Sequence, residues 1–171
     1  MVTLVNPGLP PITISTKAFD LRMDKYDLGE GYVAGLTGTA PAAATNNVMA
    51  RIANPSSATK TLRIYKLILS AATINFFQYG KPVTPALAAL ANVVVPNVKK
   101  AGGAAAVGTF TFANNSAQLP PGPQVNHRVA ANTTIEVLVG VILPPNSSWD
   151  LGAADTTTAD TVDIAAEWYE E

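Results

Sequence analysis

The chain has a single histidine among its 171 residues, and this residue is the first candidate for catalysis or metal binding. His127 stands beside Arg128 in a polar stretch, which is typical of a surface or interface residue in a loop. A cupin-like metal site needs two or three imidazoles and a carboxylate, so one histidine cannot make it. No Ser and Asp pair accompanies His127 as a nucleophile and its partner. We therefore expect that the chain is not an enzyme, and we assign no catalytic residue.

Three aspartates near the C-terminus could supply oxygen ligands to a cation. Asp155, Asp160 and Asp163 lie within the sequence DTTTADTVD, and oxygen-rich loops can bind calcium. The spacing of an EF-hand, with its closing Glu, is absent. The better interpretation is a solvated loop, and no metal site is expected.

Two further groups are poor candidates for a site. Glu167, Glu170 and Glu171 form an acidic end that we interpret as a solvated terminus and not as an active pair. Residues 101–104 carry Gly-Gly, but they lack the spacing of a phosphate-binding loop and a helix after it. No cofactor is expected.

The composition favours a protein that is covered by partners. Hydrophobic residues make up 48% of the chain and charged residues 13%, about half of the ~25% typical of globular domains. With 11 Lys and Arg against 12 Asp and Glu, the net charge is −1. A small uncharged monomer is the alternative. The only basic cluster is Lys99-Lys100, so nucleic acid is not expected as a partner, because phosphate binding needs several cations.

The chain has no cysteine, which excludes a disulfide framework, a thiol nucleophile and a thiolate zinc site. This fits a reducing cytoplasm or a particle assembled there. The start, MVTLVNPGLPP, lacks the basic and apolar regions of a signal peptide, and no apolar run reaches ~18 residues. No membrane partner is expected.

The last third of the chain, residues 132–171, has the clearest strand pattern. Apolar residues alternate in two runs: Ile135, Val137, Val139, Val141 and Leu143, then Val162, Ile164, Ala166 and Trp168. Period-two alternation predicts strands with one buried face, so Trp168 should face the core and Glu167 and Tyr169 the other side. Between the runs we expect a Pro-Pro turn and a long polar loop, so the two strands should not form a tight hairpin.

Similar patterns predict strands elsewhere. They cover residues 47–54, 61–71, 74–79, 93–98, 107–112 and 125–129. In the second of these, one face should hold Leu62, Ile64 and Ile68, and the other Arg63, Tyr65, Leu67 and Leu69. Residues 84–92 are ambiguous and fit one or two helical turns with Thr84 as N-cap. Seven to nine short strands predict an all-β fold, an antiparallel β-sandwich or jelly roll.

The first part of the chain differs from the rest. Residues 1–45 are rich in proline and glycine, which oppose long helices and central strands. We expect an extended N-terminal arm at 1–45 that tethers the protein to neighbours, and a jelly-roll-like β-domain at 46–171. The alternative is a first strand followed by a long surface loop of the same domain.

Four segments carry a resemblance to a family. They are residues 50–55 (ARIANP), 61–67 (TLRIYKL), 143–151 (LPPNSSWDL) and 166–171 (AEWYEE). In this order they resemble the small virion proteins of tailed bacteriophages, namely capsid cement or decoration proteins. The family usually has glycine after the Pro-Pro pair. Asn146 stands there in this chain, and asparagine tolerates the same left-handed backbone.

The resemblance implies a jelly-roll-like fold, often a homotrimer, that binds the major capsid protein where capsomers meet. It also implies a place on the capsid surface of the virion, after assembly in the host cytoplasm. The alternative is a receptor- or carbohydrate-binding β-sandwich of a tail fibre or head fibre. For that function Trp149, Tyr169 and Tyr79 could form an aromatic platform for a sugar.

Overall fold

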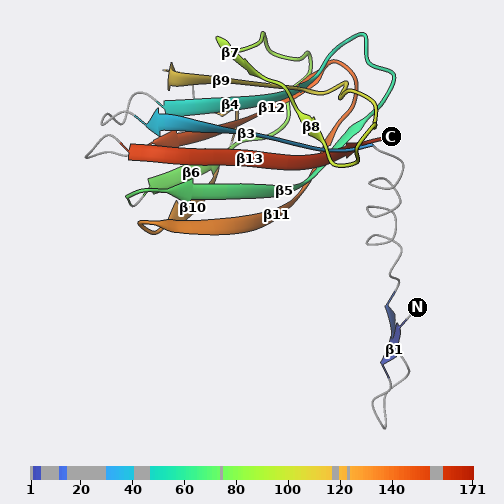
Figure 1. Ribbon diagram of the computed structural model, residues 1–171, viewed down its shortest axis with the longest axis horizontal. Helices are drawn as coiled ribbons and strands as arrows, with labels where there is room; N and C mark the ends of the chain where they lie inside the picture. The colour runs from blue at the N-terminus through green and yellow to red at the C-terminus, as the bar shows by residue number, and fades with distance from the viewer. Residues whose placement is uncertain are drawn as a thin grey trace.

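The computed structural model describes residues 2–4, 12–14, 30–40, 47–73, 75–116, 120–122, 124–154 and 160–171. Within these ranges the protein is all-β, with two antiparallel sheets packed face to face (Figure 1). The predicted fold class is therefore confirmed. None of the described residues belongs to a helix that could span a membrane.

Most of the described strands belong to two large sheets. The five-stranded sheet has the order β11 (Thr133–Leu143), β5 (Leu62–Ala71), β13 (Asp160–Glu170), β3 (Gly31–Ala40) and β8 (Asn97–Val98). The six-stranded sheet has the order β10 (Val125–Val129), β6 (Asn75–Tyr79), β12 (Ser147–Ala154), β4 (Asn47–Asn54), β9 (Thr109–Ser116) and β7 (Asn92–Val94). Two short strands, β1 (Val2–Leu4) and β2 (Ile12–Ile14), pair with each other and with neither large sheet.

The strand order is that of a jelly roll. Along the chain, β3 pairs with β13, β4 with β12, β5 with β11 and β6 with β10, all antiparallel. Successive pairs alternate between the two sheets, as in a folded ribbon of four antiparallel pairs that is rolled up. The segment between β6 and β10 adds β7, β8 and β9 at one side of the sandwich (Figure 1).

Side chains on the inner face of each sheet fill the space between the sheets. The largest of them are Tyr32, Ile52, Leu62, Ile64, Leu67, Leu69, Phe110, Leu143, Trp149, Ile164 and Trp168. Trp168 is 0% exposed and lies in phase with Val162 and Ile164, so its predicted orientation is confirmed. The predicted absence of a tight hairpin between β11 and β13 is also confirmed, because β5 lies between them.

The predicted faces of β5 were wrong beyond Tyr65, because a bulge changes the phase there. Lys66 pairs with Glu167 and Ile64 with Trp168, so Tyr65 has no partner in β13. The extra residue moves Leu67 and Leu69 to the core face and Ile68 to the outer face.

The predicted boundary of the N-terminal arm at residue 45 was wrong, because β3 is an internal strand between β13 and β8. Its glycines are needed where neighbours come close. A Cβ on Gly35 would lie 2.7 Å from Ala165 Cβ, and one on Gly38 would lie 3.0 Å from Val48 Cγ1. The glycines that suggested an arm therefore allow a closely packed strand. Apart from β1 and β2, the arm before Glu30 lies outside the described residues.

The predicted polar loop between the last two strands was wrong in its first half. Residues Ser147–Ala154 form β12, an internal strand between β6 and β4. Trp149 and Leu151 face the core, while Ser148 and Asp150 face outward and are also buried. The turn before β12 has Asn146 at φ 62°, the left-handed conformation expected there.

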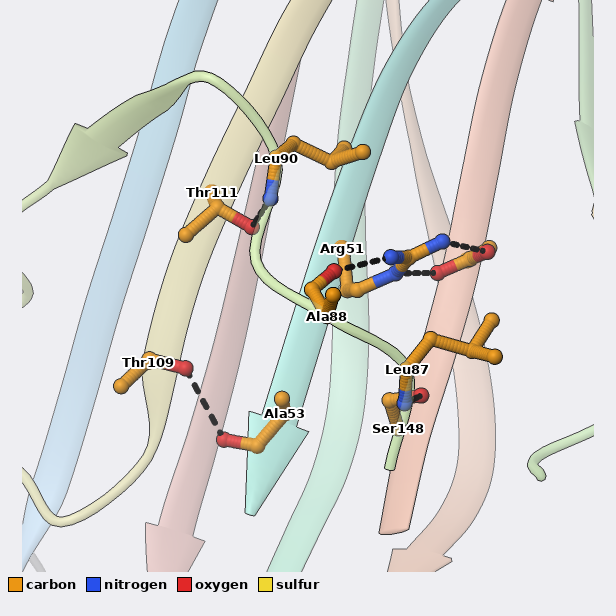
Figure 2. A network of polar contacts seen from close by, with 9 residues as sticks. Arg51, Ala53, Leu87, Ala88, Leu90, Thr109, Thr111 and Ser148 are labelled. Carbon is orange, nitrogen blue, oxygen red and sulfur yellow. Dashed lines mark hydrogen bonds and ion pairs between the residues drawn. The ribbon is translucent and has the colours of Figure 1, made fainter. Parts of the chain in front are cut away.

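Residues 84–92 form no helix, because the six-stranded sheet binds their backbone in an extended form (Figure 2). Leu87 N donates to Ser148 Oγ at 3.0 Å, and Leu90 N donates to Thr111 Oγ1 at 3.1 Å. Between them, Arg51 donates to the carbonyl oxygen of Ala88. This segment covers the outer face of β4 and β12, so the two strands are buried on both sides.

Candidate functional site

The aspartates that might have held a cation do not converge. Asp160 is 3% exposed and accepts hydrogen bonds from Thr73 N at 2.9 Å and Asn75 Nδ2 at 3.1 Å. Asp163 is exposed on the other face of β13. Asp155 lies outside the described residues. Within the described ranges no group of three or more His, Cys, Asp or Glu residues could hold a metal ion.

The prediction that the acidic end is solvated was wrong for two of its three glutamates. Glu170 is 1% exposed and accepts hydrogen bonds from Val107 N and Gly108 N, both at 2.9 Å. Trp168 Nε1 also donates to Glu170 at 3.3 Å. Glu170 therefore fixes the segment before β9 to the last strand. Glu167 is 7% exposed and lies on the outer face of the same strand.

His127 lies on strand β10 and not in a loop. Its ring stacks on Tyr79 with centroids 5.5 Å apart, and its Nε2 lies 3.3 Å from the Tyr79 hydroxyl. Tyr79 in turn meets Trp149 edge-on at 5.1 Å. Trp149 is 1% exposed, and Tyr169 lies on the outer face of the other sheet, so the expected aromatic platform is not assembled.

The edge formed by β7 and β8 exposes apolar side chains. Between these strands the chain passes from the six-stranded to the five-stranded sheet through Val95 and Pro96. Val93 is 70% and Val95 80% exposed. We call residues 92–98 the β7–β8 rim. It lies opposite the side that carries β10 and β11 (Figure 1).

A groove of about 150 Å³ opens on the outer face of the five-stranded sheet. Tyr65 from β5 and Tyr169 from β13 contribute rings whose centroids lie 6.4 Å apart with a 32° tilt. The groove is also lined by Gly140 and Ile142 of β11 and by Arg63 of β5. We call this the tyrosine groove.

The bulge at Tyr65 forms the groove. Between the pairs on either side of Tyr65, β13 has no intervening residue. β11 has two intervening residues, Val139 and Gly140. The ladder between β5 and β11 is therefore interrupted at this level, and neither Val139 nor Gly140 is paired with a residue of β5. This groove was not predicted from the sequence. The available signal was Gly140, an isolated glycine within an apolar strand pattern, which suggests a bulge or a close approach.

The charges around the tyrosine groove are compensated locally. Glu167 accepts a hydrogen bond from the Tyr65 hydroxyl and lies 2.8 Å from Lys99 Nζ and 3.5 Å from Lys66 Nζ. Arg63, which lines the groove, forms an ion pair with Glu171.

Among the titratable core residues, Tyr32 has a shifted pKa. Its hydroxyl donates to the carbonyl oxygen of Ala104 at 3.2 Å. Burial raises the pKa of Tyr32 above its usual value of 10.0, and the negative charges of Glu170 and Glu30 raise it further. This hydroxyl therefore remains protonated and acts as a structural donor that fixes the segment before β9.

The geometry defines an eight-stranded jelly roll with an added edge and two exposed features, the β7–β8 rim and the tyrosine groove. Comparison with protein-family models, with curated proteins and with solved structures gave no match in any of the three searches.

Proposed function

We propose that the chain is a structural virion protein that binds the outside of a phage capsid and stabilises contacts between capsomers of the major capsid protein. The observation that carries the proposal is the β7–β8 rim, with Val93 and Val95 exposed on one short segment. Each sheet has one of its edge strands in this rim, β7 or β8, so backbone groups there can pair with a strand of a partner. The low charge of the chain supports a surface that is covered in an assembly. The jelly roll occurs in viral proteins, but the fold alone carries no function.

Replacing Val93 and Val95 together with aspartate should weaken attachment to capsids about 10- to 100-fold, or about 1.4–2.8 kcal/mol. Two charges would then have to be desolvated in an apolar contact. Both side chains are exposed, so the melting temperature should hardly change. The measurement is co-sedimentation with capsids that lack the protein.

The matched control for the rim is Leu138→Asp, because Leu138 is 78% exposed on the opposite side of the sandwich. This variant should attach like the unaltered protein. Equal attachment of the rim variant and the unaltered protein would contradict a rim-mediated contact.

We further propose that the protein is a homotrimer. The low charge of the chain, with 13% charged residues and a net charge of −1, supports association of copies. Light scattering at micromolar concentration should give three times the chain mass of 17.8 kDa. A strictly monomeric species, alone and on the particle, would contradict this assembly.

The second candidate function is a receptor- or carbohydrate-binding module of a tail or head fibre. The tyrosine groove is the observation that favours it, since it brings two aromatic rings together on an open surface. Attachment to fibres instead of capsids, in fractionated virions, would favour this function.

A further inference from the structure

The tyrosine groove has a size that limits its occupant. Its volume of about 150 Å³ is below the ~300–1,000 Å³ typical of sites for drug-sized ligands. A single six-membered ring is therefore a better fit than an extended oligomer. The groove is open on one side, which leaves room for further units of a chain outside it.

The groove combines aromatic rings with charged side chains. Tyr65 and Tyr169 are both half-buried, so part of each ring remains available for contact. Tyrosine combines an apolar ring with a polar hydroxyl, which suits a ligand that is apolar on one face and polar at its edge. Arg63 lines the groove and can donate to hydroxyl groups at that edge, and its ion-pair partner Glu171 can accept from them.

The charge balance favours a neutral ligand over an anion. Arg63 already pairs with Glu171, and Glu167 already pairs with Lys66 and Lys99. A phosphate or carboxylate would have to displace one of these carboxylates. A hydroxyl group can instead share their hydrogen bonds without a change in charge.

Gly140 provides the space for a ligand in the wall of the groove. A Cβ built on this residue would meet no atom within 4 Å, and its backbone lies outside the left-handed region that demands glycine. Neither the backbone nor the packing of the chain therefore requires a glycine here. Because Gly140 has no side chain, the space beside the two tyrosines is open.

We propose that the tyrosine groove binds one neutral pyranose unit of a surface glycan. One face of the sugar ring, with its C–H groups, packs against Tyr169 and Tyr65, and its hydroxyls bond to Arg63 and Glu171. The groove is lined by β11, β5 and β13, and β8 lies at the opposite edge of the same sheet, so the groove and the β7–β8 rim can be occupied at once. The inference does not require attachment to a capsid and is tested separately from it.

The test is an NMR titration of the full chain with methyl glycosides of neutral hexoses and N-acetylhexosamines. At least one sugar should shift the ring signals of Tyr65 and Tyr169 and the amide of Gly140, with millimolar affinity. Gly140→Val fills the groove and should weaken binding at least about tenfold without lowering the melting temperature. Tyr169→Ala should weaken binding to a similar extent.

The matched control is Leu138→Ala, which alters an exposed side chain on the same strand and face but outside the groove. It should bind like the unaltered protein. The proposal is overturned if no sugar shifts these signals, if Gly140→Val binds as well as the unaltered chain, or if methyl phosphate or sialic acid binds more tightly than every neutral sugar.

Discussion

Replacing Asp150 with alanine should lower the free energy of unfolding by about 3–5 kcal/mol, because it leaves a buried guanidinium without its carboxylate. Asp150 accepts two hydrogen bonds from Arg51, at 2.7 and 2.8 Å, and both residues are 2–3% exposed. Arg51 also holds the segment at Ala88 on the sheet (Figure 2). Denaturant unfolding of the variant and the unaltered chain measures the difference.

The control for this pair removes both charges. Arg51→Met combined with Asp150→Leu should recover most of the stability, since replacing a buried ion pair by apolar residues is often neutral or stabilising. If Asp150→Ala alone costs less than about 1 kcal/mol, Arg51 is solvated in solution and the segment at residues 84–92 does not cover it.

Replacing Trp168 with alanine should cost about 3–5 kcal/mol and lower the melting temperature by about 6–20 °C. The side chain is 0% exposed, stacks on Tyr32 at 6.0 Å and donates to Glu170. Its loss opens a cavity between the sheets and removes one of the contacts that fix Glu170. A thermal melt followed by circular dichroism measures the change.

Two variants calibrate the effect of Trp168. Trp168→Phe retains most of the apolar area and should cost less than the alanine variant. Glu171→Ala removes a partly exposed ion pair with Arg63 and should cost at most about 1 kcal/mol. A Trp168→Ala chain that melts normally but no longer attaches to particles would contradict a core position and indicate a contact residue.

The sequence was sufficient to predict strands in which apolar and polar residues alternate. β11 and β13 follow that pattern most clearly, and the position of Trp168 in the core followed from phase alone. Alternation reports a sheet with one covered face, so it identifies strands whose other face meets solvent or charged side chains.

Two internal strands were missed because their outer faces are also covered or closely packed. In β12 the outward residues Ser148 and Asp150 are polar yet buried, since Arg51 and Leu87 N supply their partners. In β3 glycine replaces the usual β-branched residues where Ala165 leaves no room. Such compensation depends on residues far away in the sequence.

The tyrosine groove was also beyond the reach of pattern analysis. It depends on the number of unpaired residues that each of three strands has at the bulge: none in β13, one in β5 and two in β11. The burial of Glu170 has the same origin, because its partners, Val107 N and Gly108 N, come from the segment before β9. Neither the register nor these partners can be deduced from local composition.

The most direct test of the proposed function is a cryo-electron microscopy reconstruction of the intact particle that carries this protein. We predict jelly-roll density on the outer capsid surface where capsomers meet, with the β7–β8 rim against the major capsid protein and the tyrosine groove facing outward. Density for this fold only at the end of a fibre, or no density on the capsid, would contradict the proposal.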